Sequence, residues 1–180
     1  GTGKTSFAAT LAARVGAQTS FEHALADSVE EINQAGIAAA PGGLSILVAE
    51  DNDINALLAR ALLTRLGHRP TIAGHGEAAV ESWTAARAAG APYDLVLMDV
   101  QMPGVDGLEA ARRIRAIEAA TENESARHPT RIIALTANAY AEDREACLAA
   151  GMDGLLVKPL DRERLRDALE TTARASPLAA

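Results

Sequence analysis

Five polar residues of the chain share one feature, because each stands at the end of a short apolar run. Glu50 and Asp51 end the run Ile46–Ala49, Asp99 ends Leu95–Met98, Thr136 ends Ile132–Leu135 and Lys158 ends Leu155–Val157. The runs are continuous rather than alternating, as expected for parallel strands that are buried on both faces of a sheet. The carboxyl ends of such strands meet at one edge of the sheet, where α/β proteins place their ligand sites. The sequence therefore predicts three carboxylates, a hydroxyl and an ammonium in one site.

These residue types point to phosphoryl chemistry. Clustered carboxylates repel and desolvate one another unless a cation lies among them. Mg²⁺ suits such a site, because it prefers one or two carboxylates together with phosphate oxygens and water. Asp99 could attack phosphorus as a nucleophile. Lys158, Thr136 and backbone N–H groups would then balance the charge on the phosphoryl oxygens.

The choice of lysine at position 158 is unusual in this chain. Only Lys4 and Lys158 are lysines, and every other basic residue is an arginine. A compact ammonium at 158 would fit a small pocket better than a planar guanidinium. Pro159 follows directly, and a cis bond before Pro159 could fix the direction of the lysine.

The segments between the apolar runs follow the helical period. One stripe comprises Ile54, Leu57, Leu58, Ala61, Leu62 and Leu66, and further helices are expected over about 79–86, 108–117, 140–150 and 161–172. A weaker fifth strand is expected at Pro70–Ala73. Strand and helix thus alternate five times over about 130 residues. This order predicts an open, doubly wound parallel sheet with right-handed crossovers.

Composition excludes several classes of protein. The 180 residues are 48% hydrophobic and 23% charged, which is typical of one globular domain with some surplus, not of a disordered chain or a disulfide scaffold. The 24 acidic and 17 basic residues give a net charge of −7, which disfavours nucleic acid as a partner. No apolar run reaches the roughly 18 residues of a membrane span, and the single Cys147 fits a reducing compartment. We therefore expect a cytoplasmic segment without direct membrane contact.

Several ordered motifs resemble the receiver domain of bacterial two-component response regulators over about residues 44–172. They are ILVAEDN at 46–52, LMDVQMPG at 97–104 followed by Asp106 and Gly107, ALTANA at 134–139, GMD at 151–153 and Lys158-Pro159. The resemblance implies a flavodoxin-like α/β fold, with a doubly wound five-stranded parallel sheet of order 2-1-3-4-5 and five helices. The LTANA run and the pattern from Cys147 to Asp153 look most like receivers attached to hybrid sensor histidine kinases.

The same resemblance implies a phosphoacceptor and a metal site. Asp99 would be the phosphoacceptor, which takes a phosphoryl group from the histidine of a histidine kinase or a histidine phosphotransfer protein. Mg²⁺ would be the cofactor. Asp51, Asp99 and the backbone carbonyl of Gln101 would bind the metal directly, and Glu50 would bind it through water.

The resemblance also implies how the phosphoryl group is held and read. Thr136, Ala137 and Lys158 would bind it, and Gln101 and Asn138 would hold the two positions that set how fast it hydrolyses. The added charge would switch a partner-binding surface around the last strand and the last two helices. Leu155 stands where many receivers carry Tyr or Phe, which argues against an aromatic switch.

We predict a receiver domain over 44–174, a partial upstream segment and linker over 1–43, and a C-terminal tail over 175–180. GTGKT at 1–5 is similar to the end of a P-loop but lacks its first glycine and preceding strand. Residues 4–16 could instead be the last helix of an upstream receiver. His23 lies in a segment too short for the helical bundle of a phosphotransfer module. The start at Gly1 favours the terminal receiver of a longer kinase over a stand-alone receiver.

Simpler interpretations apply to other residues. Asp53 and Asp106 are expected at helix starts, and Cys147 is expected as a small buried residue. A phosphatase or NTPase with the same carboxylates would need substrate-recognition insertions that the sequence lacks. A receiver that binds partners without phosphorylation would be expected to have lost an acid or the lysine. Homodimerisation is left open.

Overall fold

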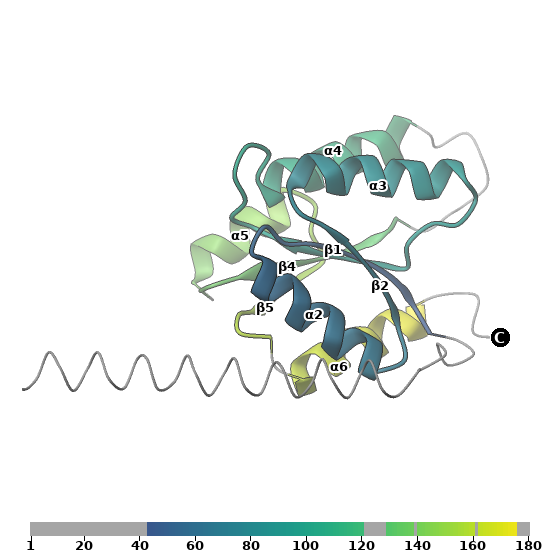
Figure 1. The fold of residues 1–180 in the computed structure, drawn as a ribbon. Helices are drawn as coiled ribbons and strands as arrows, with labels where there is room; N and C mark the ends of the chain where they lie inside the picture. The colour runs from purple at the N-terminus through teal and green to yellow at the C-terminus, as the bar shows by residue number, and fades with distance from the viewer. Residues whose placement is uncertain (1–42, 121–128, 139, 161, 176–180) are drawn as a thin grey trace, which may run out of the picture. The chain divides into compact units, whose positions relative to one another are not determined.

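This computed structural model describes residues 43–120, 129–138, 140–160 and 162–175. The described residues form strands and helices that alternate along the chain (Figure 1). The strands are β1 (Ser45–Ala49), β2 (Arg69–Ala73), β3 (Leu95–Asp99), β4 (Arg131–Thr136) and β5 (Gly154–Val157). The helices are α2 (Asp53–Arg65), α3 (Gly76–Ala88), α4 (Gly107–Ala120), α5 (Ala141–Ala149) and α6 (Arg162–Ala175). The predicted elements are all present. The predictions for residues 1–42, including Lys4 and His23, and for residues 176–180 of the predicted tail lie outside the described residues.

The five strands form one parallel sheet in the order β2-β1-β3-β4-β5. This confirms the predicted doubly wound order 2-1-3-4-5. The register pairs Ala49 with Met98, Asp99 with Leu135 and Thr136 with Val157. The carboxyl ends of β1, β3, β4 and β5 therefore lie at one edge of the sheet. The polar residues that the sequence pattern singled out stand at or just after these strand ends.

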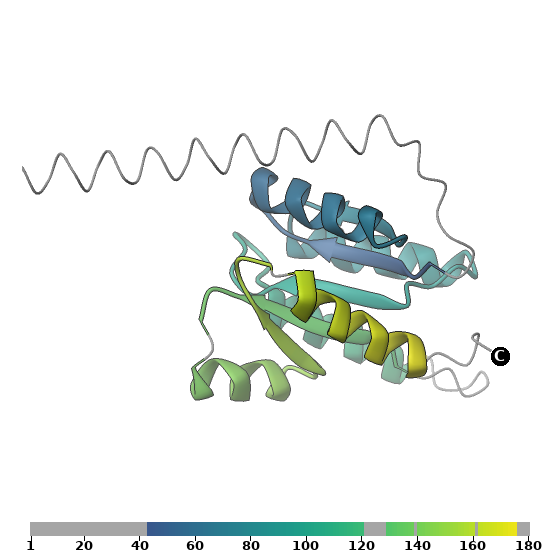
Figure 2. The same cartoon turned by 90° about the horizontal axis from the view of Figure 1, so that it is seen from below.

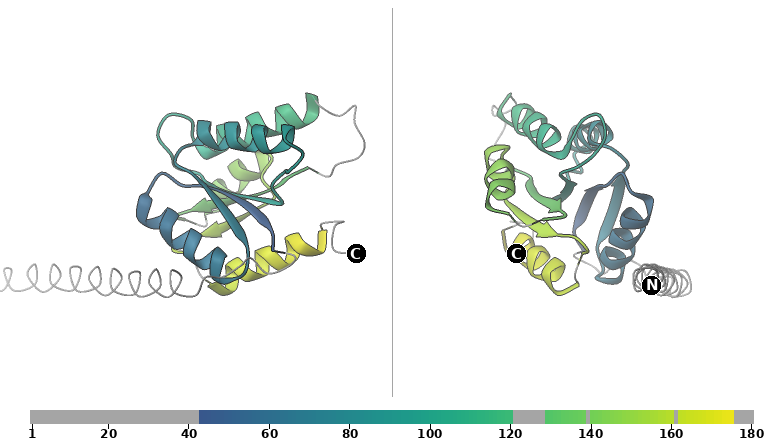
Figure 3. Two further views of the ribbon diagram at one scale, coloured as in Figure 1. Left: turned by 45° about the vertical axis from the view of Figure 1, so that its right-hand side comes forward. Right: turned by 90° about the vertical axis from the view of Figure 1, so that its left-hand side faces the viewer.

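Helices cover both faces of the sheet. Figure 2 shows α2 and α6 across one face, and the end-on view in Figure 3 shows α3, α4 and α5 on the opposite face. On the α3–α4–α5 face, fully or nearly buried Trp83, Ile114 and Cys147 pack against strand residues such as Val96. On the other face, Leu63, Leu165 and Leu169 pack against strand residues that include Ile46 and Leu97. Because β1 and β3 are buried on both sides, their sequences are continuous apolar runs.

The two outer strands are less buried than the apolar runs suggested. All four residues of β5 are half-buried, and β2 has two exposed residues, Arg69 and Thr71. Both strands lie at edges of the sheet, where a strand has only one neighbour. The expectation that Leu155–Val157 would be fully buried was therefore wrong, although the strand itself is present.

The buried face of α2 agrees only in part with the predicted stripe, of which Ala61 is buried and Leu62 and Leu66 pack against the core. Ile54 and Leu57 are 45% and 40% exposed, whereas Ala59 and Leu63 are buried at 1% and 0%. Apolar residues occupy most of the circumference of this helix, so the sequence offers two adjacent stripes of helical period. The packing of Leu63 against the sheet selects the stripe that contains Ala56, Ala59 and Leu63.

Arg115 of α4 joins three segments. Its guanidinium donates to the carbonyls of Thr130 and Gly151, both at 2.8 Å, and pairs with Asp153 at 2.9 Å. Asp153 Oδ2 also accepts the backbone N–H of Ile132 at 2.8 Å. The GMD motif at 151–153 is thereby tied to α4 and to the start of β4, away from the carboxyl ends of the strands. Its role in the described structure is to hold the entry into β5.

Two smaller predictions are confirmed. Asp106 accepts the N–H of Glu109 at 2.7 Å and so caps the start of α4, and Cys147 is 3% exposed. Among the helices of the described residues, none has the length and apolar character that crossing a membrane requires.

The corrected face of α2 predicts a contrast between two leucines. Leu63→Ala should lower the free energy of unfolding by about 2–5 kcal/mol, because it leaves a cavity at a fully buried site. Leu57→Ala should cost less than about 1 kcal/mol, because its side chain is 40% exposed. Urea unfolding of both variants measures the difference. Equal losses would show that the predicted stripe, not the observed one, faces the core.

His68 predicts a pH dependence of stability. Its Nδ1 accepts the N–H of Leu44 at 3.1 Å, and burial lowers the pKa of His68 although nearby Asp94 opposes this shift. The fold thus favours the neutral ring, so its contribution is complete above about pH 6.5 and is lost as pH falls through the lowered folded-state pKa. His68→Asn retains an acceptor that does not titrate. Unfolding free energies should therefore fall more steeply between pH 7.5 and 5.5 for the parent than for His68→Asn, and parallel profiles would contradict this.

Candidate functional site

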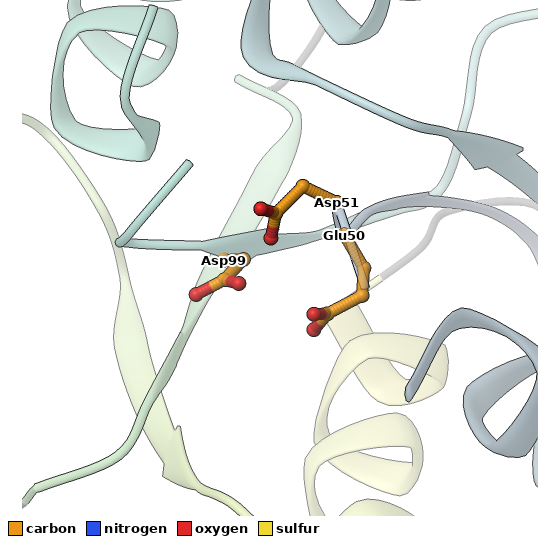
Figure 4. Close-up of side chains that lie close together, drawn as sticks. All are labelled: Glu50, Asp51 and Asp99. Atoms are coloured by element: carbon orange, nitrogen blue, oxygen red, sulfur yellow. The ribbon is translucent and has the colours of Figure 1, made fainter. Parts of the chain in front are cut away.

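Three carboxylates meet between the ends of β1 and β3. Glu50 and Asp51 lie in the loop after β1, and Asp99 is the last residue of β3 (Figure 4). One carboxylate oxygen from each lies within 4.8 Å of the others. Glu50 and Asp99 are only 3% and 4% exposed, whereas Asp51 is exposed to solvent. The structure thus brings together the three acids that the sequence pattern singled out.

Lys158 joins the two buried acids. Its Nζ donates to Asp99 Oδ2 at 2.6 Å and lies 2.7 Å from Glu50 Oε2. Its backbone N–H donates to the carbonyl of Thr136 at 2.8 Å, which ties the residue after β5 to the end of β4. The peptide bond to Pro159 is cis. The contact with Glu50 was not foreseen, since the sequence suggested only a phosphoryl partner for this lysine.

Backbone and amide donors fix the two buried carboxylates. The N–H of Gln101 donates to Asp99 Oδ1 at 3.1 Å. Asn55 Nδ2 donates to Glu50 Oε1 at 3.1 Å, and the N–H of Asn52 approaches the same oxygen at 3.4 Å. Sequence reasoning missed Asn55, because a polar residue in the first turn of a helix carries no periodic signal of its own.

The cap of α2 corrects another expectation. Asn52, not Asp53, is the capping residue: its Oδ1 accepts the N–H groups of Ile54 and Asn55, both at 3.1 Å. Asp53 is the first residue of the helix. Asn is among the preferred caps, so this signal was present in the sequence. The cap leaves the carboxylate of Asp51 outside the helix and beside Asp99.

The end of β4 contributes Thr136, which is 8% exposed. Its Oγ1 accepts the N–H of Asn138 at 3.2 Å. Thr136 directly follows Leu135, the register partner of Asp99, so the hydroxyl belongs to the strand next to the candidate phosphoacceptor. Ala137 and Asn138 are exposed. Leu155 of β5 pairs with Ala134 and is half-buried against the core on the α3–α4–α5 side.

Comparison with known proteins identifies the family. A sequence model of the response regulator receiver domain matches residues 46–170. This chain belongs to the response regulator receiver domain family. It is 44% identical to histidine kinase 5 of Arabidopsis thaliana over 144 residues, which cover 69% of this chain but 15% of that kinase. The chain thus spans about a seventh of the length of that relative.

Solved structures carry the same fold. The receiver domain of a sensor histidine kinase from Pseudomonas aeruginosa, crystallised with a magnesium ion in its active site cleft, is 41% identical with a TM-score of 0.61, over 73% of this chain and 98% of that one. A second similar structure is the co-crystal structure of the Saccharomyces cerevisiae histidine phosphotransfer protein Ypd1 and the receiver domain of Ssk1. The two chains are 28% identical with a TM-score of 0.66, over 73% of this chain and 90% of that one.

The electrostatics of this receiver domain leave negative charge uncompensated. Burial raises the pKa of the Asp99 carboxyl above its ordinary range, against the hydrogen bonds from Lys158 and Gln101, and the charge of Glu50 adds to the rise. Burial would lower the pKa of Lys158, but its hydrogen bonds to Asp99 and Glu50 prevail and raise that pKa. The ammonium therefore stays charged, and one ammonium does not offset the burial and crowding of the carboxylates.

The donor set fits a hard divalent cation. Carboxylate oxygens from Glu50, Asp51 and Asp99 converge within 4.8 Å, and three carboxylates against one ammonium leave an excess of two negative charges. Mg²⁺ takes oxygen ligands and retains several waters, which the exposed position of Asp51 permits. The residues present thus satisfy the chemistry that such an ion requires.

Removal of the bridging ammonium should move the titration of Asp99 further. In metal-free protein we expect the Asp99 carboxyl to titrate above the ordinary value of about 3.9. Lys158→Met should raise its pKa again, because a nearby cation favours the charged form of a carboxylate. Carboxyl ¹³C shifts against pH measure both values. Arg113→Met, which removes an exposed cation on α4 that pairs with Glu109, is the matched control and should leave the Asp99 titration unchanged.

Proposed function

We propose that this receiver domain accepts a phosphoryl group on Asp99 from a phosphohistidine and thereby switches a partner-binding surface. The observation that carries the proposal is the bridge from Lys158 to Asp99 and Glu50, with the exposed Asp51 beside them. One group of residues thus supplies a nucleophile, a cation for phosphoryl oxygens and oxygen ligands for Mg²⁺. The magnesium-bound receiver from Pseudomonas aeruginosa supports the same assignment.

The transfer is a displacement at phosphorus. A carboxylate oxygen of Asp99 forms the new O–P bond as the N–P bond of the phosphohistidine breaks, and the imidazole nitrogen leaves with the bonding electrons and takes up a proton. Asp51, Asp99 and the Gln101 carbonyl would hold Mg²⁺ directly and Glu50 through water. When bound, the metal supplies positive charge to the phosphoryl oxygens.

The remaining site residues act on the phosphorylated form. Lys158, which already donates to Asp99, pairs with a phosphoryl oxygen. The hydroxyl of Thr136 turns from the Asn138 N–H toward the phosphoryl group, and the backbone of Ala137 follows it. Gln101 and Asn138 flank the group and set the rate of its slow self-hydrolysis. With Leu155 in place of an aromatic residue, the movement of Thr136 and its loop transmits the change to α5, β5 and α6.

The context of the domain is the second part of the proposal. The similarity to a histidine kinase and to a receiver crystallised with a phosphotransfer protein favours a phosphorelay, with a histidine kinase or a histidine phosphotransfer protein as partner. We propose that residues 44–174 are the receiver of a hybrid sensor histidine kinase. We also propose that it works in the cytoplasm, tethered to a membrane sensor where the parent chain has one, without binding nucleic acid. Homodimerisation stays a prediction.

Phosphorylation by a small donor tests the acceptor. With acetyl phosphate and Mg²⁺, the protein should gain the mass of one phosphoryl group, and Asp99→Asn should gain none, because its amide is not a nucleophile. Asp106→Asn is the matched control, since Asp106 is an exposed acid that caps α4 nearby, and it should be labelled like the parent. Intact-mass spectrometry reads all three, and a chelator should abolish the labelling.

Equal labelling of the parent and Asp99→Asn would contradict Asp99 as the acceptor. Incubation of the labelled protein with a histidine phosphotransfer protein then addresses the context. Appearance of label on that partner supports the phosphorelay, whereas label that only decays to inorganic phosphate supports a receiver that is the last acceptor of the phosphoryl group.

A further inference from the structure

The loop between β3 and α4, residues 100–106, holds the neighbours of the phosphoacceptor. The N–H of Gly107 donates to the carbonyl of Val100 at 3.1 Å and closes the loop. Inside it, the N–H of Gln101 donates to Asp99 Oδ1 at 3.1 Å. A shift of this loop therefore moves both a donor to Asp99 and the carbonyl proposed as a metal ligand.

The start of α3 touches this loop where no side chain fits. A Cβ added to Gly76 would lie 2.2 Å from the carbonyl oxygen of Val105, 3.0 Å from its carbonyl carbon and 3.1 Å from its Cγ1. Real Cβ atoms essentially never approach another heavy atom closer than 3.0 Å. Two of the three contacts are backbone atoms, so a side-chain rotation cannot relieve them. Either α3 or the loop must move if residue 76 carries a Cβ.

The loop is the side that yields. Helix α3 is anchored by Ala79 and Trp83, which are 0% and 1% exposed, and Trp83 Nε1 donates to Thr130 Oγ1 at 3.1 Å. In the loop, Gln101, Pro103 and Gly104 are exposed and Val105 is half-buried, and of residues 100–106 only Met102, which is 7% exposed, is buried in the core. Displacing α3 would disrupt the packing around Ala79 and Trp83, whereas displacing Val105 moves a loop that is held in the core mainly by one side chain.

We propose that Gly76 is a positioning residue for phosphoryl acceptance: its missing side chain lets the loop carrying Gln101 seat against α3 in the geometry that Mg²⁺ and the donor require. The inference rests on the proposed function of Asp99. Gly76 lies on α3 and outside the acidic cluster, and the proposal gives it an effect on the geometry of the metal and phosphoryl site. Gly76 acts through Val105 and the loop and does not touch the reacting atoms.

The test compares two glycines in the full chain. Gly76→Ala inserts the clashing methyl group. Gly74→Ala is the matched control, because a Cβ at Gly74 has nothing within 4 Å and its backbone needs no positive φ. Val105→Ala is a second variant, which loosens the loop from the core without inserting an atom. Thermal unfolding of each variant establishes that it is folded at the temperature of measurement.

Three readouts separate positioning from a general loss of structure. In metal-free Gly76→Ala, backbone amide shifts should change at Gln101, Met102 and Val105 more than along β4 and β5. Its Mg²⁺ affinity should fall, and its acetyl phosphate labelling at saturating Mg²⁺ should slow, each by on the order of tenfold, since misplacement of about 1 Å can cost up to ~100-fold. Val105→Ala should change both in the same direction, and Gly74→Ala should match the parent.

Three outcomes would overturn the proposal. They are a Gly76→Ala chain that does not fold, amide shift changes confined to α3, and unchanged Mg²⁺ affinity and labelling in a folded Gly76→Ala. The first counts against it because the loop, not the fold, should absorb the methyl group. If the parent itself fails to bind Mg²⁺ or to be labelled, the proposed function fails instead, so the two failures are distinguishable.

Discussion

The bridge between Lys158 and two buried carboxylates is the interaction on which the site depends. Glu50 and Asp99 are almost fully buried, and burial of two like charges is costly unless a cation compensates them. Lys158 compensates in part, at 2.6 Å from Asp99 and 2.7 Å from Glu50, yet the pKa of Asp99 remains raised. This residual imbalance favours the binding of Mg²⁺ at this edge of the sheet, and such a cation would in turn let an anionic phosphoryl group approach the carboxylates.

The parallel sheet makes this concentration of charge possible. The acids follow β1 and end β3, and the lysine follows β5, two strands away from β3 in the sheet. A long flexible side chain crosses that gap, whereas the short carboxylates must come from adjacent strands. The hydrogen bond from the Lys158 N–H to the Thr136 carbonyl fixes the point from which the lysine reaches. The fold therefore supplies the direction of each side chain, and the residues supply the charge.

The residue pattern was sufficient for the convergence of Glu50, Asp51, Asp99 and Lys158, because polar residues that follow parallel strands lie at one edge of the sheet. The strand order came from the resemblance to receiver domains, and the structure confirms it. The residue pattern was insufficient wherever two arrangements satisfy it. The apolar circumference of α2 offered two stripes, and only packing placed Ile54 and Leu57 outside. No sequence pattern pointed to Asn55 or Gly76. Asn55 acts through a single hydrogen bond, and Gly76 acts through the lack of a side chain.

The contrast between Lys158 and Arg115 explains why a chain rich in arginine has a lysine at this position. Arg115 makes separate contacts through Nε and both terminal nitrogens, with the carbonyls of Thr130 and Gly151 and with Asp153. A planar fork suits a permanent junction of that kind. Lys158 instead presents one nitrogen to Asp99 and Glu50 together. A single ammonium on a flexible stem can exchange a carboxylate oxygen for a phosphoryl oxygen by a small movement, whereas a guanidinium would have to rotate its whole plane within the buried site.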